Sequence, residues 1–336
     1  MSVLRRAALS ACAFLVGALT LSLSLAHAEP PKPCQGSDLT KVDGLAAAES
    51  ARADDLVNGD GLLWRIEKPG LAPSYLFGTI HSTDESALEI ARRAAQSING
   101  AKVVATELGG PIDVIEKANI TAATLASALD RDHDTFEGAV APADREKIEK
   151  YISGVGYPAA FAHHLKPWFL AILTGLPKCE AERESLNLPE VDQFLAETGR
   201  DLGVKVSGLE TAEEQLAAIA NMRPQVAATL LTLTARDPGL NDDLYATMLR
   251  LYRESRPAEI VAITDAIGGL SEAERAAQDE FMGDLLQGRN AIMAERAAPL
   301  LASGGAFIAI GALHLAGKTG LVERFRAQGY TVTKVW

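Results

Sequence analysis

Residues 74–108 alternate between two apolar, β-prone runs and an amphipathic segment that separates them. The first run covers residues 74–80 (SYLFGTI) and the second covers residues 102–108 (KVVATEL). Between the runs, apolar residues recur at helical spacing until Asn99-Gly100, which is a typical helix stop. A strand, a helix and a strand within about 35 residues connect by default through a parallel, right-handed crossover. This stretch therefore predicts an α/β fold with a mostly parallel sheet.

The same pattern returns in the second half of the chain. Apolar runs that predict further strands lie at residues 203–209, 306–313 and 330–336. Residues 318–328 have the pattern of a helix, and two long tracts near 113–176 and 213–300 are rich in Ala, Leu, Glu and Arg. We expect these tracts to be large helical insertions in one α/β domain over residues 62–336. A separate helical domain is the alternative, although no Gly-, Ser- or Pro-rich linker marks its boundary.

Two helix starts have the spacing of a capping box, in which Ser or Thr is followed three residues later by Glu. Ser82 and Glu85 precede the first helix, and Thr211 and Glu214 precede a helix in the second half. We expect each pair to exchange hydrogen bonds between its side chains and the first backbone amides of its helix.

The first 28 residues have the three parts of a secretory signal peptide. Arg5 and Arg6 give a basic start, residues 7–25 are mostly apolar, and residues 26–28 form a small-x-small cleavage site. An uncleaved membrane anchor is the alternative, because about 20 apolar residues could span a bilayer. Residues 29–61 are interpreted as a leader segment that wraps the body. We expect a periplasmic or secreted protein with no stable membrane span after cleavage.

Cleavage leaves two cysteines, Cys34 and Cys179. An even pair in an oxidising compartment favours a disulfide. In the chain-entropy model such a bond contributes about 4 kcal/mol, because it closes a long loop. Two free thiols are the alternative. The sequence has no Cys-x-x-Cys pair, so it supports neither thioredoxin-like chemistry nor a zinc ribbon.

Charge and motif content exclude several classes of protein. Acidic residues outnumber basic residues by 44 to 32, and the net charge is -12 at pH 7. No cluster of Lys and Arg in the body could neutralise a phosphate backbone, so nucleic acid is a poor candidate partner. The motifs H-E-x-x-H, G-x-S-x-G and G-x-G-x-x-G are absent. Their absence argues against thermolysin-type peptidases, serine α/β-hydrolases and ordinary dinucleotide enzymes.

Four polar residues follow predicted strands at their carboxyl ends. They are His81, Glu107, Glu210 and His314. Ligands bind at this edge of a parallel sheet, because strand ends and helix N-termini converge there. Two imidazoles and two carboxylates suit a Zn, Mn, Fe or Co ion. Taken alone, each residue is more often a turn residue or a helix cap, so the prediction of a metal site depends on the grouping.

Each of these histidines lies three residues after a glycine. Gly78 precedes His81, and Gly311 precedes His314. A glycine at this point allows close backbone approach or a bulge just before the turn that carries the ligand. The remaining candidates, His133, His163 and His164, are interpreted as surface or packing residues.

At these residues the chain resembles the TraB/GumN family, whose relatives include the animal Tiki proteins. The two Gly-x-x-His motifs and the Gly-Leu-Glu-Thr segment between them make the resemblance specific. It extends through most of residues 62–336, in the segments 75–81 (YLFGTIH), 104–108 (VATEL), 165–168 (LKPW), 208–216 (GLETAEEQL), 289–290 (RN) and 310–317 (IGALHLAG).

The resemblance implies an α/β fold of two related halves. One half would contribute His81 and Glu107 to a central cleft, and the other would contribute Glu210 and His314. Cys34 and Cys179 are similar to the paired cysteines of secreted bacterial members. Tiki proteins are described as Mn- or Co-dependent metallopeptidases, so the resemblance makes a metal-dependent peptidase the leading activity.

The resulting hypothesis is an exported metal-dependent hydrolase that acts on a peptide or another envelope substrate. His81, Glu107 and His314 would hold a divalent Mn, Co or Zn ion and acidify a bound water, and Glu210 would take the proton of that water. Arg289 would orient a substrate carboxylate or stabilise an oxyanion, or else clamp the helical insertion to the glutamates. A non-catalytic protein that binds metal, haem or an envelope ligand is the alternative, and a scaffold is a third. The residues alone leave this choice open.

Overall fold

The structure is a computed structural model that describes residues 34–42, 57–110, 114–175, 177–186, 188–267 and 270–336. The predicted signal peptide and its cleavage site lie outside these residues, as does most of the leader segment.

Six strands form one sheet in the described residues, in the order β4-β3-β5-β2-β1-β6. Their bounds are β1 (Leu63–Glu67), β2 (Ser74–Thr79), β3 (Val103–Thr106), β4 (Lys205–Gly208), β5 (Ala306–Gly311) and β6 (Thr331–Lys334). The pairs β2–β5, β3–β5 and β3–β4 are parallel. The first five of the six residues of β5 are buried, as expected for a central strand with helices on both faces. The predicted α/β fold with a mostly parallel sheet is confirmed.

One edge of the sheet is antiparallel. β1 pairs antiparallel with β2 on one side and with β6 on the other. β1 escapes sequence-based prediction because its alternating run is only five residues long, with exposed Arg65 between buried Trp64 and Ile66.

Two strand–helix–strand units interlock within the four parallel strands. The first unit runs from β2 through a helix to β3, and the second runs from β4 through the later helices to β5. In the sheet, β2 and β3 enclose β5, while β4 and β5 enclose β3. The carboxyl ends of all four strands consequently meet at one edge, with contributions from both halves of the chain.

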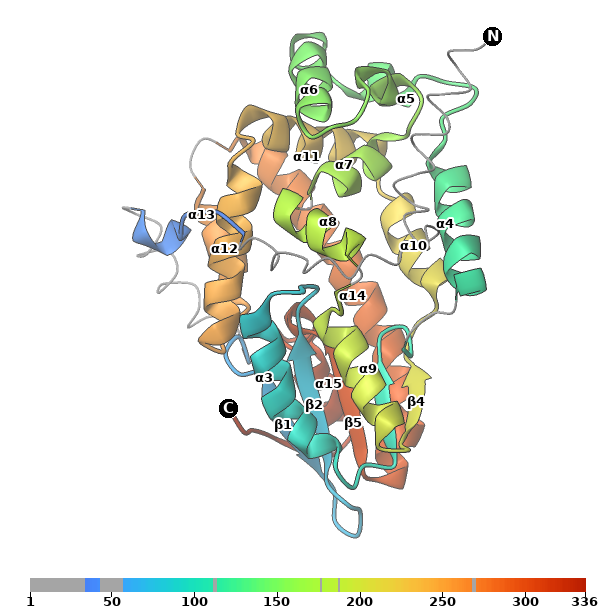
Figure 1. Ribbon diagram of the computed structural model, residues 1–336. Coiled ribbons are helices and arrows are strands. Elements are labelled where there is room, and N and C mark those ends of the chain that lie inside the picture. The colour runs from blue at the N-terminus through green and yellow to red at the C-terminus, as the bar shows by residue number, and fades with distance from the viewer. Residues whose placement is uncertain (1–33, 43–56, 111–113, 176, 187, 268–269) are drawn as a thin grey trace, which may run out of the picture.

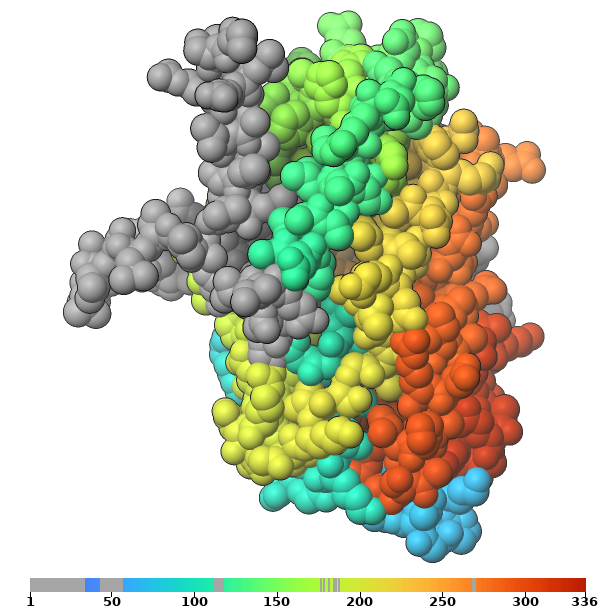
Figure 2. Space-filling model, turned by 90° about the vertical axis from the view of Figure 1, so that its right-hand side faces the viewer, coloured from blue at the N-terminus to red at the C-terminus, as the bar shows by residue number. Residues whose placement is uncertain are grey.

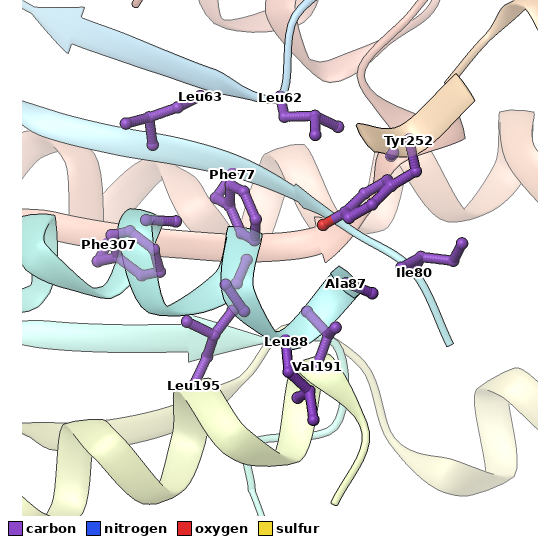
Figure 3. Close-up of a cluster of buried hydrophobic side chains, with 14 of the residues drawn as sticks. Leu62, Leu63, Phe77, Ile80, Ala87, Leu88, Val191, Leu195, Tyr252 and Phe307 are labelled. Atoms are coloured by element: carbon purple, nitrogen blue, oxygen red, sulfur yellow. The ribbon is translucent and has the colours of Figure 1, made fainter. Parts of the chain in front are cut away.

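Helices cover both faces of the sheet. The helices are α3 and α9 on one face and α14 and α15 on the other, with the bounds Glu85–Ala95, Val191–Asp201, Glu272–Ser303 and Leu321–Ala327. Figure 3 shows Phe77 and Phe307 on the side of the sheet that Leu88 of α3 and Leu195 of α9 cover. Alternate strand residues, such as Leu76 of β2, face α14 and α15.

The remaining helices form a helical part that extends from the carboxyl edge of the sheet (Figure 1). They are α4 (Val114–Ala128), α5 (Thr135–Ala139), α6 (Pro142–Gly154), α7 (Pro167–Gly175), α8 (Lys178–Ser185), α10 (Ala212–Ala220), α11 (Pro224–Arg236), α12 (Leu240–Arg253) and α13 (Glu259–Ala266). A separate apolar cluster that includes Phe136, Trp168 and Leu231 packs α5, α7 and α11 together. α14 joins the two parts, because Ala277 belongs to this cluster while Leu301 belongs to the core beneath the sheet.

α10 lies between α4 and α14 on the face of the molecule shown in Figure 2. α10 packs against both neighbours. This contact matters for the site, because α10 carries Gln215 and α14 carries Arg289.

One of the two predicted capping boxes is wrong. Asp84 caps α3, and its carboxylate accepts a hydrogen bond from the Ser86 amide at 2.9 Å. Ser82 lies two residues earlier, where its hydroxyl accepts from the Asp84 amide and bonds to the Tyr245 hydroxyl at 2.7 Å. Ser82 therefore bonds to a residue far away in the chain, Tyr245, instead of capping α3.

The second capping box is confirmed. The Thr211 amide donates to the Glu214 carboxylate at 2.9 Å, and the Glu214 amide donates to the Thr211 hydroxyl at 3.2 Å. This box begins α10 directly after Glu210, which fixes the start of the helix beside the carboxyl end of β4.

The predicted disulfide is present. Cys34 and Cys179 are bonded, with their Cα atoms 5.2 Å apart. The bond ties a short segment of the leader, residues 34–42, to α8. None of the described helices is both long enough and apolar enough to cross a bilayer.

Candidate functional site

The four strand-end residues leave the sheet at the same edge, as predicted. Thr79 of β2 pairs with Gly311 of β5, and Thr106 of β3 pairs with Gly208 of β4. The turns that follow these strands carry His81, Glu107, Glu210 and His314. Three of the four, Glu107, Glu210 and His314, lie within one hydrogen-bonded and charged cluster, whereas His81 stands beside it.

Gly311 lets the carboxylate of Glu107 approach the end of β5. The Gly311 amide donates a 2.8 Å hydrogen bond to Oε1 of Glu107. A Cβ atom on Gly311 would lie 3.1 Å from that oxygen and 3.4 Å from Cδ2 of His314. Of the close backbone approach and the bulge expected at this glycine, the structure has a close approach, that of the Glu107 side chain to the backbone.

Gly78 has the corresponding role in the first Gly-x-x-His motif. A Cβ atom there would lie 3.0 Å from both Cα and Cβ of Ala312, in the 3₁₀ turn that follows β5. The two motifs thus pack directly against each other at the end of adjacent strands.

Arg289 of α14 joins the two glutamates. Its Nε atom donates to both oxygens of Glu210, at 3.0 and 3.1 Å. Its Nη2 atom donates to Oε2 of Glu210 at 2.7 Å and to Oε2 of Glu107 at 2.8 Å. The Arg289 side chain is 12% exposed and that of Glu210 is 0% exposed. Two roles were considered for Arg289. The structure shows the ion pairs of the second role, which clamp α14 to the ends of β3 and β4.

Gln215 of α10 is a further member of this cluster. Its Nε2 atom donates to Oε2 of Glu107 at 2.9 Å and lies 3.4 Å from Oε2 of Glu210. Gln215 was not singled out in the sequence, because a glutamine in the first turns of a helix carries no signal of its own. Both Glu210 oxygens are occupied, so the predicted base can take a proton only after its ion pair with Arg289 opens.

Asn290 selects one tautomer of His314. The Asn290 amide nitrogen donates to the carbonyl of Thr319 at 3.2 Å, which can only accept, so its Oδ1 faces Nδ1 of His314 at 2.7 Å. Nδ1 of His314 therefore carries the proton, and Nε2 presents a lone pair. The His314 side chain is 5% exposed, and burial lowers its pKa to about 4. His314 is consequently a neutral imidazole at physiological pH.

The free nitrogen of His314 faces an ionised carboxylate. Nε2 lies 3.9 Å from Oε1 of Glu107. Burial of Glu107 opposes its ionisation, but the charges of His81 and Arg289 and the hydrogen bond from the Gly311 amide outweigh this effect, so its pKa is lowered. Two electron-pair donors thus face each other across a short gap.

His81 lies at the other side of this edge and faces the start of α9. Its side chain is 65% exposed, and its Nδ1 atom lies 3.5 Å from Oε2 of Glu190 and 3.7 Å from Oδ2 of Asp192. The Glu190 carboxylate is the main cause of a raised pKa for His81, and the charge of Asp192 acts in the same direction. His81 also lies close enough to Glu107 for their charges to interact.

Asp192 is a member of the site that the strand-end pattern misses. Its Oδ1 atom accepts from the Thr79 hydroxyl at 2.9 Å, while Oδ2 is buried and lacks a hydrogen-bond partner. Burial raises the pKa of Asp192 to about 7, against the opposing charge of His81. The sequence pattern around Asp192 indicates only an acidic residue in the first turn of a helix. Acidic residues are common there because they stabilise the helix, so the pattern does not indicate a site.

The imidazole nitrogens and carboxylate oxygens of the site are atom types that bind divalent cations, but they do not surround one common point. Nitrogen and oxygen ligands lie about 2.0–2.2 Å from such an ion, so one ion could contact both Nε2 of His314 and Oε1 of Glu107. His81 and Asp192 are the nearest further donors on the same edge. Within the described ranges, no group of three or more His, Cys, Asp or Glu residues is arranged to hold a metal.

The histidines interpreted as surface or packing residues lie in the helical part. His163 is half-buried and contacts Asp134 at 2.5 Å and Glu149 at 3.2 Å. His133 and His164 are exposed. These positions agree with the interpretation.

Comparison with known proteins gives one match. A profile of the TraB/PrgY/gumN family matches residues 62–334. No curated protein and no solved structure matches the chain. The matched span contains β1 to β6 and all four strand-end residues.

Proposed function

The chain belongs to the TraB/PrgY/gumN family, and we propose that it is an exported, metal-dependent hydrolase with peptides as its leading substrate class. Membership of this family is one ground for the proposal. The other is that the residues of the site include nitrogen and oxygen donors that suit a divalent ion. The proposal assigns the ion to the carboxyl edge of the parallel strands, where the two Gly-x-x-His motifs meet.

One observation carries the proposal: the unprotonated Nε2 atom of His314 faces the ionised Oε1 atom of Glu107 at 3.9 Å. Neither atom has a proton to share with the other, so a bare contact of this kind is electrostatically unfavourable. A divalent cation, of Mn, Co or Zn, would satisfy both atoms together. His81 would supply the third ligand after its ring gives up a proton, because a metal-ligating histidine is neutral and metal binding releases protons.

The surrounding residues have supporting roles. Asn290 holds His314 in the tautomer that presents Nε2, as outer partners of ligating histidines commonly do. Arg289 and Gln215 hold Glu107 in place through its other oxygen. When bound, the ion would polarise a carbonyl and acidify a water.

Asp192 is a better candidate for the general base than Glu210. Its Oδ2 atom has no hydrogen-bond partner and lies 3.7 Å from Nδ1 of His81. Glu210 is held by Arg289 through both of its oxygens. We therefore propose that Asp192 accepts the proton and that Glu210 holds Arg289 in place.

A non-catalytic binding protein is the second candidate, for metal, haem or an envelope ligand. The observation that favours it is the ion pair of Arg289 with both Glu107 and Glu210, which occupies the carboxylates expected to do chemistry. A protein that only holds a ligand needs neither carboxylate to exchange a proton.

The test begins with protein purified without a His tag. Bound metal is counted by mass spectrometry, and cleavage of a peptide library is followed with added Mn, Co or Zn. We expect one ion for each chain and cleavage that His81→Ala and His314→Ala abolish. The exposed His164→Ala is the matched control. An ion without cleavage would favour the binding protein, and neither an ion nor cleavage would contradict the metal-dependent hydrolase.

Export is part of the same proposal. The Cys34–Cys179 bond is consistent with an oxidising compartment, because such bonds are rare in the cytosol. N-terminal sequencing of the mature protein tests it. We expect the first residue to be Glu29, and a chain that retains its first 28 residues would contradict cleavage.

A further inference from the structure

Glu180 is a buried carboxylate that holds the loop after His81. Its side chain is 2% exposed. The Thr83 amide donates to it at 3.1 Å and the Thr83 hydroxyl at 2.9 Å, and the Ser82 hydroxyl lies 3.4 Å from its other oxygen. The two residues that directly follow His81 are therefore bound to Glu180.

Two further groups complete the surroundings of this carboxylate. The Tyr245 hydroxyl of α12 donates to it, and Nη1 of Arg183 lies 3.3 Å away. A buried carboxylate is costly unless it is paired and hydrogen-bonded. The buried charge of Glu180 is therefore compensated only while α8, α12 and the loop after His81 keep these contacts.

The neighbouring residue in the chain is Cys179, whose disulfide holds α8 in place. Its partner Cys34 begins a segment that lies along α12. In that segment the Ser37 amide donates to Asp243 at 2.6 Å and the Leu39 amide donates to Thr247 at 2.9 Å. The disulfide therefore joins α8 to α12 through residues 34–42, next to the carboxylate that needs both helices.

α12 also holds the other side of the His81 loop. The buried Tyr252 hydroxyl donates to the carbonyl of Gly78 at 2.8 Å. The loop that carries His81 is thus held by Tyr252 before the histidine and by Glu180 after it. Of these two contacts, only the one with Glu180 involves α8, the helix that carries Cys179.

We propose that Glu180 is a positioning residue that couples the Cys34–Cys179 disulfide to the loop that carries His81. A dithiol reductant would break the S–S bond, leave two thiols on this chain and itself become a disulfide. α8 would then be released from α12, and Ser82 and Thr83 would lose their shared acceptor. The redox state of the disulfide would in this way control the position of His81. The consequence for metal binding rests on the proposed function, whereas the coupling itself does not.

Hydrogen exchange of the loop tests the coupling without any metal. The Thr83 amide is measured in the oxidised and the reduced protein, with the β1–β6 amides as an internal reference. We expect exchange at Thr83 to become about tenfold faster on reduction while the reference amides are unchanged. Unchanged exchange at Thr83 would overturn the proposal. Loss of protection throughout the sheet would also overturn it, because the bond would then stabilise the whole fold.

A substitution at Glu180 distinguishes the role of its carboxylate from that of the disulfide. Glu180→Gln keeps the bond but weakens the acceptor, and Glu89→Gln, at an exposed position of α3, is the control. We expect Glu180→Gln to speed exchange at Thr83 and Glu89→Gln to leave it unchanged. Equal behaviour of the two variants would overturn the assignment of Glu180.

The affinity for Co²⁺, measured by calorimetry, gives the readout that a purely structural role would not change. We expect it to fall about tenfold in Glu180→Gln and in the reduced protein. If oxidised wild-type protein binds no Co²⁺, the proposed function fails, and the exchange data still decide the coupling. If Co²⁺ binds with equal affinity in all forms, control of His81 through Glu180 is contradicted.

Discussion

His314 and Glu107 face each other through an unprotonated nitrogen and an ionised oxygen that lie 3.9 Å apart. They reach this position from β5 and β3, which are neighbours in the sheet although the two residues are far apart in the chain. Asn290 keeps the proton on the far nitrogen of His314, and Arg289 keeps Glu107 ionised.

Arg289→Gln should destabilise the fold by about 3–5 kcal/mol, because it leaves two buried carboxylates with one amide in place of a guanidinium. Denaturant unfolding of the purified variant measures the change. Arg223→Gln is the control, since Arg223 pairs with Glu280 on the surface and should matter little. A similar small change for both variants would contradict the clamp assigned to Arg289.

Gly311→Ala should cost about 1–3 kcal/mol, because its Cβ atom would press on the Glu107 carboxylate and on the ring of His314. The exposed Gly138 of α5 is the matched position, since a Cβ atom there would meet nothing within 4 Å. Gly138→Ala should stabilise the protein by about 0.5–1 kcal/mol. Thermal melting measures both changes, and we expect the melting temperature to fall in Gly311→Ala and to rise in Gly138→Ala. Tolerance of alanine at Gly311 would show that the backbone approach is not needed.

The pair of His163 and Asp134 should make the stability of the helical part depend on pH. The hydrogen bond with Asp134 chiefly raises the pKa of His163, so this contribution is complete below about pH 6.5 and is lost as the pH rises through the raised value. The pKa of Asp134 is lowered although burial opposes it, so its contribution is present at neutral pH and is lost in acid.

Denaturation midpoints at about pH 6 and about pH 9 test this pair. We expect the midpoint of the wild-type protein to fall between the two values, and the fall to be smaller in His163→Gln. The exposed His164→Gln should behave as the wild type does. An equal fall in all three proteins would mean that other groups cause the pH dependence.

Asp192→Asn should slow peptide cleavage by about 100-fold or more while leaving stability nearly unchanged, because its unpartnered oxygen contributes no hydrogen bond to the fold. Glu210→Gln should instead lower stability, since it weakens the ion pair with Arg289. Asp201→Asn, at the exposed end of the same helix α9, is the control. Loss of cleavage in a stable Glu210→Gln with full activity in Asp192→Asn would restore Glu210 as the base.

The strand-end residues could be predicted because their position follows from topology alone. Once residues 74–80 and 306–313 are recognised as parallel strands, His81 and His314 must leave the same edge. The glycines before them could be predicted for the same reason, since neighbouring strand ends approach closely.

The partners of these residues could not be predicted in the same way. Gln215, Asn290 and Asp192 belong to helices, and the sequence does not show which helix will reach the edge of the sheet. Ser82 illustrates the point, because its local pattern predicts a cap while Tyr245, from α12, takes its hydroxyl. Contacts of this kind depend on how distant helices pack, which local patterns do not encode.

Anomalous diffraction at the metal edges, from crystals of protein purified without a His tag and supplied with Mn, Co or Zn, shows whether an ion joins His314 to Glu107. We expect one peak about 2.0–2.2 Å from both Nε2 of His314 and Oε1 of Glu107. The same map should show whether His81 completes the site. An ion bound elsewhere, or no ion with His314 and Glu107 still facing each other, would mean that these two residues are not a metal site.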